Sequence, residues 1–320
     1  MLGFVVRRAA TSILLLVAAS VLVFVILRLL PGDPIITRLG ATAGANPEAI
    51  DQLRREAGLD DPILQQYLDW IGGVLTGDFG QSYFSQFSVT DLIGRRIGAT
   101  LELTAVSILF SLLIAVPAAV FCALRRGSWL DRLVTTGSTV GMALPQFLLG
   151  ILLILVFAVE LRWLPARGYV PFVDDPGENV RRMVLPALTL AIAAAPLILR
   201  YLRASMIEVL DSSYIRTAEG KGVPHRRVVV AHALRNALIP GLTMLGMVVG
   251  YTLGGVVIVE YVFGIPGLGS LAVESVFKRD YAVLQSVVLL ISALFILTTL
   301  AVDLLYGVLD PRLRNGGARG

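Results

Sequence analysis

Few side chains in this sequence have the types and the spacing that chemistry requires. The chain holds one cysteine, Cys122, and two histidines, His225 and His232, so we expect no disulfide within the chain and no metal site. Lys221 is followed by Gly222 and lacks the upstream glycine spacing of a phosphate-binding P-loop. A nucleophile elbow and a dinucleotide fingerprint are also missing from the sequence. We therefore predict that the chain is not an enzyme and binds no cofactor.

The polar feature that remains is a basic segment rich in small residues, at positions 214–240 between two apolar runs. We expect Ser212 or Ser213 to cap a short helix and Gly220 and Gly222 to end it, because glycine lacks a Cβ atom. A helix with so low a profile can dock into a cleft of another protein. An ordinary connecting loop is the alternative. The polar anchors of the helix would be Arg216, Glu219 and Lys221.

The composition determines the environment in which these elements fold. Hydrophobic residues make up 56% of the chain and charged residues only 16%, which exceeds the apolar content that a soluble domain uses. A bilayer core needs about 20 apolar residues per helical crossing. We therefore predict an all-α polytopic membrane protein with six transmembrane helices. The first run is too long for a signal peptide and no cleavage site follows it, so we expect it to be retained. The six runs are 9–30, 100–124, 133–159, 183–199, 238–259 and 283–305.

The distribution of lysine and arginine predicts the orientation. If the N-terminus is cytoplasmic, basic residues are more than twice as dense in the cytoplasmic pieces as in the outer pieces. We therefore expect both termini in the cytoplasm. The net charge of +4 then reflects this topology and attraction to anionic membrane lipid, and not nucleic-acid binding. The cytoplasmic pieces would be 1–8, 125–132, 200–237 and 306–320.

The region 31–99, between the first two apolar runs, carries its own helix signals. Asn46 before Pro47 predicts a helix start, and Gly58 can end that helix in a left-handed conformation. Asp61 is expected to cap a second helix with a single apolar face. This extracytoplasmic region would either contact an external substrate or carrier protein, or only close the outer mouth. The apolar face would comprise Ile63, Leu64, Tyr67, Leu68, Ile71, Val74 and Leu75.

Prolines and ionisable residues within the apolar runs suggest where the helices move and what they transport. Prolines interrupt these runs and are candidate pore or hinge positions, although kinks that serve packing alone are the alternative. Arg28, Glu102 and Asp303 are expected near helix ends, which argues against a proton relay or an ion-coupled carrier. The candidate prolines are Pro117, Pro145, Pro186 and Pro196.

Several motifs, in order along nearly the whole chain, resemble the permease subunits of binding-protein-dependent ABC importers of the dipeptide/oligopeptide class, the DppB/OppB type. The strongest are YIRTAEGKG at 214–222 and HALRNALIP at 232–240. Two departures stand out: Gly220 replaces the alanine usual in this class, and the spacing to Pro240 exceeds that of the wider importer superfamily. The others are LPGDP at 30–34, GLDDP at 58–62, QYLDW at 66–70, GDFGQS at 77–82, EYVFGIPGLG at 260–269, DLLY at 303–306 and LDPRLR at 309–314.

The resemblance implies a type I ABC importer permease fold and a bacterial cytoplasmic (inner) membrane location. Residues 216–222 would form a coupling helix that docks on a separate ATPase subunit, where ATP and Mg²⁺ bind. The implied partners are a second homologous permease, two ABC ATPase subunits or domains, a peptide substrate, and an external solute-binding protein docking on 31–99 and 260–280. The implied coupling residues are Tyr214, Arg216, Thr217, Ala218, Glu219, Gly220, Lys221 and Gly222.

The expected organisation has a first helix, an outer region, a five-helix core with a coupling segment, and a cytoplasmic tail. Three alternatives stay open at this point. An importer of nickel or another small solute would share the same motifs, because selectivity largely resides in the binding protein. An ATP-independent secondary transporter and a membrane scaffold subunit are the alternatives from other classes. The expected boundaries are 1–30, 31–99, 100–310 with coupling segment 203–237, and 311–320.

Overall fold

The computed structural model describes residues 2–29, 47–56, 58–85 and 87–309. All regular elements in this part are helices, apart from one isolated bridge between Gln81 and Ser88. Five helices are long and apolar enough to cross a membrane, and six if a bent pair counts as one span. The expected all-α polytopic fold is therefore confirmed. The elements are α1 Leu2–Leu29, α3 Pro47–Glu56, α4 Ile63–Thr76, α5 Val89–Leu124, α6 Trp129–Ala143, α7 Gln146–Leu153, η2 Ile154–Glu160, α8 Pro176–Leu210, α9 Ser213–Gly220, α10 His225–Arg227, η3 Val228–Leu234, α11 Arg235–Phe263, α12 Leu268–Lys278 and α13 Tyr281–Leu309.

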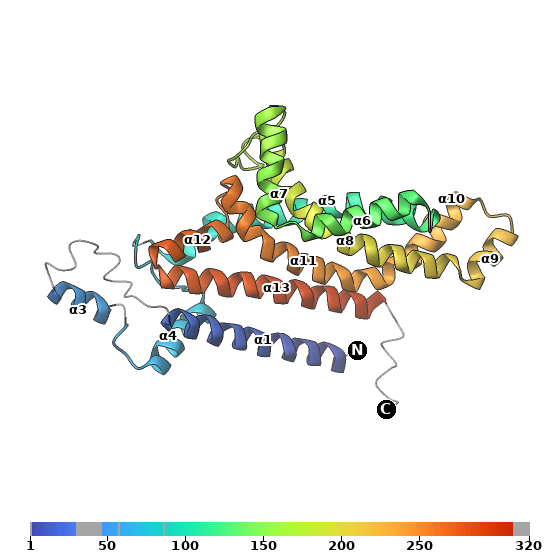
Figure 1. Cartoon of the computed structure of the whole chain (residues 1–320). Coiled ribbons are helices and arrows are strands. Elements are labelled where there is room, and N and C mark those ends of the chain that lie inside the picture. Colours follow the sequence, from blue (N-terminus) through green and yellow to red (C-terminus); the bar gives the residue numbers. More distant parts are fainter. Residues whose placement is uncertain (1, 30–46, 57, 86, 310–320) are drawn as a thin grey trace.

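The long helices run side by side, with short helices at both ends of the bundle (Figure 1). Helices α3, α4 and α12 lie at one end, and α9 and α10 lie at the other. The core forms where α8 packs on α5, and both helices bury small residues completely, among them Ala191 and Ala194 of α8 and Ser107 and Ser111 of α5. The two serine hydroxyls donate to carbonyls one turn earlier in α5, at 2.6 and 2.7 Å. Small, internally bonded side chains let the two helices approach closely within a membrane.

Several helices extend well beyond the apolar runs that predicted them. Helix α5 begins at Val89 and not near residue 100, and α8 runs from Pro176, where the Asp175 side chain accepts from the Glu178 amide at 3.0 Å. Hydropathy identifies only the part of a helix that contacts lipid, while polar turns continue into the interface. Glu102 therefore lies well inside α5, so its predicted position near a helix end was wrong.

The third predicted span is broken at Pro145. Helix α6 and the α7–η2 segment are bent by 106° relative to each other, and α7 projects from the bundle (Figure 1). Leu144 is extended before the proline, which lacks an N–H for a continuing helix. Gln146 then packs tightly on α11, where a Cβ atom at Gly255 would meet its amide oxygen at 2.1 Å. The other three candidates lie within continuous helices; they are Pro117 in α5, and Pro186 and Pro196 in α8.

At the end of the bundle that holds α3 and α12, α4 lies against α1. The rings of Tyr67 and Trp70 contact Phe24, with centroid distances of 5.4 and 6.0 Å, and the Tyr67 hydroxyl lies 2.9 Å from the Ser20 hydroxyl. Pro62 occupies the N-cap position without a side-chain cap, so the predicted capping by Asp61 was wrong.

The predicted single apolar face of α4 divides into two parts. Tyr67, Ile71 and Val74 are half-buried, whereas more than half of the surface of Leu64 and of Leu75 is exposed. The preceding helix, α3, ends as predicted, with Gly58 at φ +64°. The predicted cap of α3, Asn46, lies outside the described residues.

Candidate coupling site

Helix α9 connects the end of α8 to the chain that continues through α10 and η3 into α11. Ser212 occupies its N-cap position, but the Ser212 hydroxyl donates to the Val209 carbonyl at 2.5 Å, so the predicted side-chain cap at this residue was wrong. Gly220 is the last helical residue and not a terminator. Gly222 ends the helix at φ +79°, and its amide donates to the Glu219 carbonyl at 2.9 Å.

The amide after Gly222 completes this C-terminal cap. The N–H of Val223 donates to the Ala218 carbonyl at 3.2 Å. Together, the two bonds form a Schellman motif, which requires a left-handed residue at the position of Gly222. Glycine adopts that conformation without the Cβ clash of other residues. The predicted role of Gly222 in ending the helix is therefore confirmed.

One side of α9 is fixed to the bundle by apolar packing. The Ile215 side chain is 1% exposed and belongs to the same buried cluster as Met206 of α8 and Val228 and Val229 of η3. Ala218 is partly buried against that cluster. Burying a side chain of this size stabilises the contact by about 1.5–3 kcal/mol. Helix α9 is therefore attached to both of the long helices that flank it in sequence.

The opposite side of α9 is exposed and polar. Arg216, Thr217, Glu219 and Lys221 are all exposed, and no acidic side chain in the described part of the chain pairs with either basic residue. The Thr217 hydroxyl donates to the Ser213 carbonyl at 3.0 Å and so turns back onto the helix. This surface offers charge and a low backbone profile, but it carries no set of groups arranged for bond chemistry.

Tyr214 lies at the edge between the two sides. Its hydroxyl accepts a hydrogen bond from the Asn236 side chain at 3.0 Å, which links α9 to the first turn of α11. The structure therefore brings the eight predicted coupling residues together in one helix and its cap. The four candidate prolines lie elsewhere, at the α6–α7 break and inside α5 and α8.

Two buried charged sites were missed by the sequence interpretation. Glu260 was placed just beyond the fifth span, but it lies inside α11 and is 0% exposed. Its carboxylate accepts from the Thr100 hydroxyl at 2.6 Å and from the Ser270 amide at 3.0 Å, which holds the start of α12 against α5 and α11.

The second missed site joins α6 to α8. The Arg203 guanidinium donates to both carboxylate oxygens of Asp131, at 2.7 and 2.6 Å. Asp131 is 3% exposed and also accepts from the Gly127 amide at 2.9 Å. Asp131 and Arg203 lie 72 positions apart in the sequence, and neither belongs to a recognisable motif. Only the packing of two distant helices brings them together.

Comparison with known protein families adds to this geometry. Residues 115–315 match the model of the binding-protein-dependent transport system inner membrane component, and residues 1–104 match the N-terminal model of such membrane components. The chain belongs to this transporter family. The two matches cover the candidate coupling site and the long helices of the bundle, apart from residues 105–114 within α5.

Relatives within the family match along almost the whole chain. The glutathione transport system permease protein GsiC of Escherichia coli K12 is 43% identical over 314 residues, which cover 98% of this chain and 99% of GsiC. A probable peptide ABC transporter permease, y4tP of Sinorhizobium fredii, is 37% identical over 97% of this chain and 99% of its own length. As a family member, the chain is a transport permease component.

A solved structure shares the fold. A chain of the MetNI methionine ABC transporter, solved in inward-facing conformations, superposes with a TM-score of 0.57 at 20% identity, covering 68% of this chain and 96% of that one. At this identity the likeness establishes the architecture only. The family is thus shown by the sequence comparisons, and the solved structure shows the fold.

Proposed function

We propose that this chain forms half of the translocation pathway of an ATP-driven importer for di- and oligopeptides. The observation that carries this proposal is α9, whose buried Ile215 fixes it to the bundle while its polar side stays exposed. A partner that moves α9 would move α8 and η3 with it, because Ile215 lies in one cluster with residues of both. We assign ATP and Mg²⁺ binding to separate ATPase subunits or domains that grip this helix.

The proposed orientation places α9 and both chain termini in the cytoplasm of a bacterial inner membrane. The density of lysine and arginine supports this orientation. A salt bridge of 2.8 Å from Arg8 to Asp303 supports only the placement of both termini on one side of the membrane, because it joins the start of α1 to the last part of α13. The N-terminal part of α1 therefore lies next to the C-terminal part of α13.

At the outer end we propose docking of a solute-binding protein on residues 31–99 and 260–280. These two segments are tied together in the structure. The Asp280 carboxylate accepts from the Ser82 hydroxyl and, at 3.1 Å, from the Tyr83 amide. A movement that a binding protein causes in one segment would therefore be transmitted to the other through these hydrogen bonds. A second homologous permease would complete the pathway, with Pro145 as the candidate hinge and Pro117, Pro186 and Pro196 as pore or packing positions.

The peptide class of substrate is inferred from the names of the relatives, which are permeases for glutathione and for peptides. Nickel or another small solute is the alternative within the family. A secondary transporter and a scaffold subunit differ from an importer in needing no ATP. ATP dependence and substrate delivery by a binding protein therefore separate these functions.

A tagged pull-down from native membranes, followed by an ATPase assay, tests the proposal. We expect a second permease and P-loop ATPases to co-purify, and we expect peptide-loaded binding protein to stimulate hydrolysis more than empty binding protein. Stimulation by metal-loaded binding protein alone would assign the small-solute alternative. A chain that purifies without any ATPase would refute the importer.

A further inference from the structure

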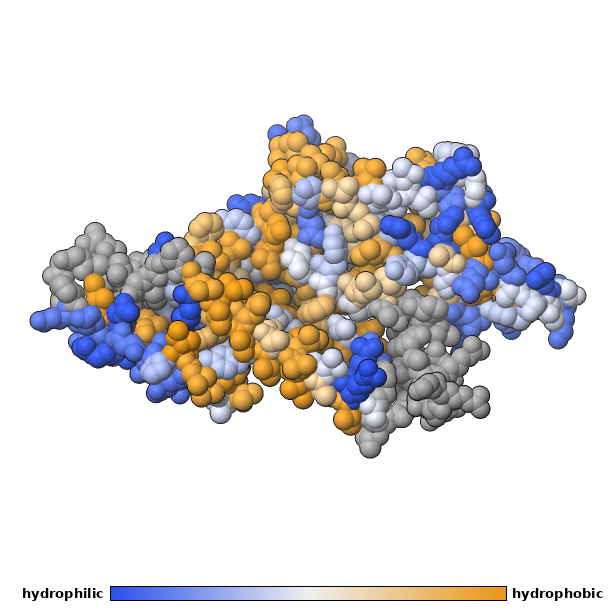
Figure 2. Space-filling model, turned by 60° about the horizontal axis from the view of Figure 1, so that its bottom comes forward, coloured by the Kyte–Doolittle hydropathy of each residue, from blue (hydrophilic) through white to orange (hydrophobic). Residues whose placement is uncertain are grey.

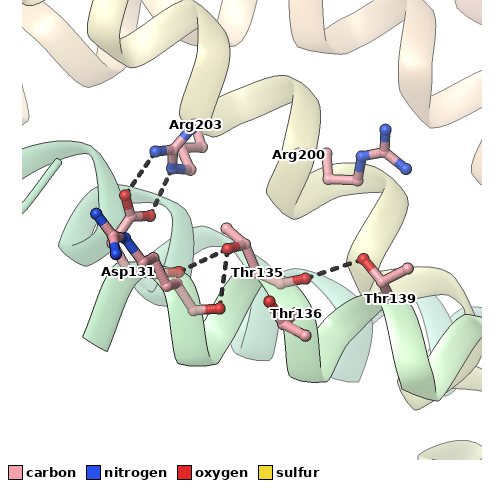
Figure 3. Close-up of a pocket in the computed structure, with 7 residues that line it drawn as sticks. Asp131, Thr135, Thr136, Thr139, Arg200 and Arg203 are labelled. Atoms are coloured by element: carbon pink, nitrogen blue, oxygen red, sulfur yellow. Dashed lines mark hydrogen bonds and ion pairs between the residues drawn. The ribbon is translucent and has the colours of Figure 1, made fainter. Parts of the chain in front are cut away.

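A polar cavity of about 640 Å³ lies between α6 and α8 (Figure 3). Its volume is in the range of sites that hold small molecules, about 300–1,000 Å³. Three threonines of α6 line it, together with Asp131 and three arginines: Arg132, Arg200 and Arg203. The last two occupy the final turns of α8 before α9 begins. The cavity therefore lies toward the end of the bundle that we place in the cytoplasm.

The arginines of the cavity are not equivalent. Arg203 is held by both carboxylate oxygens of the buried Asp131, so these two charges balance each other. Arg132 and Arg200 are exposed, and within the described chain neither is hydrogen-bonded to an acidic side chain. Figure 3 shows Arg200 on α8 without a bond to the residues around it. The cavity therefore presents two unbalanced positive charges on facing helices.

The threonines divide in the same way. The hydroxyls of Thr135 and Thr139 donate to backbone carbonyls of α6, at 2.7 and 3.0 Å. Thr136 is exposed, and its hydroxyl has no acceptor among the residues that the structure describes. The two guanidinium groups can only donate hydrogen bonds, and the free hydroxyl can donate one as well. Such a set suits an anion with several acceptor oxygens, such as a phosphate group.

An apolar stripe runs along α6 beside this cavity. Trp129, Leu133 and Val140 are 71%, 60% and 58% exposed. Their spacing of four and seven residues places them on one helix face with Thr136, next to Arg132. A soluble anion makes no use of such a stripe, but the acyl chains of a lipid do. Trp129 stands at the first residue of α6, where a tryptophan can lie at the membrane interface.

We propose that this cavity binds the phosphate of an anionic phospholipid of the cytoplasmic leaflet. Arg132 and Arg200 would contact the phosphate, Thr136 would donate to it, and the acyl chains would lie along the apolar stripe. Basic pockets between membrane helices on the cytoplasmic side are suited to such head groups. The bound lipid would connect α6 to the end of α8 that leads into α9. The inference rests on the orientation given in the proposed function, but not on the ATPase or on the substrate.

The test is lipid binding to the full-length chain purified in detergent, measured by native mass spectrometry during titration with phosphatidylglycerol or phosphatidylcholine. Each arginine near the membrane surface contributes about five-fold to the affinity for an anionic lipid. We therefore expect R132Q/R200Q to weaken phosphatidylglycerol binding by roughly 25-fold. The charge-conserving R132K/R200K should retain most of the binding. The matched control is R226Q/R227Q, which removes two exposed arginines from α10 and should bind as the wild type does.

Each further outcome decides the proposal. Equal binding of the two lipids by the wild type, or unchanged phosphatidylglycerol binding by R132Q/R200Q, would overturn it. Competition by soluble glycerol phosphate at concentrations matching the lipid would assign the cavity to a soluble anion and would also overturn it. If the wild-type chain binds phosphatidylglycerol but no ATPase subunit co-purifies with it, the lipid site is upheld and the importer is refuted.

Discussion

Two glycines of the coupling site give a matched pair of substitutions that differ in backbone conformation alone. A Cβ atom at Gly220 or at Gly222 would meet nothing within 4 Å, so neither substitution to alanine creates a clash with another residue. Gly220 is helical, whereas Gly222 has φ +79°. An L-residue in the left-handed region costs about 1–2 kcal/mol. Gly222→Ala should therefore reduce the population of the closed cap by about 5–30-fold.

Gly220→Ala should stabilise α9 rather than destabilise it. Alanine is favoured over glycine within a helix by up to about 1 kcal/mol, and less at a helix end, so this variant should hold α9 at least as firmly as the wild type. It also introduces the alanine expected from the DppB/OppB-type resemblance. Gly222→Val should destabilise the cap of α9 more than Gly222→Ala does, because a β-branched residue tolerates a positive φ less well.

The assay is transport per ATP hydrolysed by the reconstituted complex with peptide-loaded binding protein, together with hydrogen exchange of the α9 amides. We expect Gly222→Ala to exchange faster in α9 and to transport less peptide for each ATP, and Gly220→Ala to match the wild type. The reasoning fails if both variants lose coupling equally, or if Gly222→Ala keeps wild-type exchange and coupling.

Three further predictions concern buried or partly buried polar groups away from α9. Glu260→Gln should hasten hydrogen exchange in α12, because Thr100 and Ser270 donate to different oxygens of the Glu260 carboxylate and glutamine replaces one of those acceptors with an NH₂ donor; unchanged exchange would count against this anchor. Asp131→Asn should destabilise the protein by about 3 kcal/mol by leaving Arg203 unpaired, and the double variant with Arg203→Met should recover part of that loss in thermal melts; an unchanged melting temperature would contradict the pair's role. Burial, and then a hydrogen bond to a carboxylate, raise the pKa of Tyr169. Its contribution to stability should be fully present below about pH 10 and should be lost progressively as the pH rises from there through the raised folded pKa. Tyr169→Phe should flatten that alkaline decline, whereas parallel pH profiles for both proteins would refute the assignment.

The sequence predicted the spans because a run of apolar residues is a local property. Helix ends were harder to predict. Val89 starts a helix whose first turns contain Asp91, Arg95 and Arg96, and hydropathy gives no sign that such turns continue a membrane helix. The break at Pro145 was recognised only as a candidate, because membrane helices also accommodate prolines such as Pro186 without breaking.

The candidate coupling helix, α9, could be located because its glycines, its charges and its resemblance to a family all fall within one short segment. The contacts that fix it could not be predicted. Ile215 is one isoleucine among many, and only the tertiary fold brings it onto Val228 and Met206. Likewise, Asp131 and Arg203 become a pair only when α6 lies beside α8. Long-range contacts of this kind leave no local signal in the sequence.

The most direct test of the central claim is site-specific cross-linking at α9 in native membranes. The only cysteine of the chain, Cys122, is fully buried, so a cysteine introduced at an exposed position is the reactive one. We predict that Thr217→Cys cross-links to an ATPase subunit, and that Thr76→Cys, exposed on α4 at the opposite end, does not. An ATPase cross-link absent at residue 217, or equally strong at residue 76, would contradict the assignment of α9 as the helix that receives the ATPase.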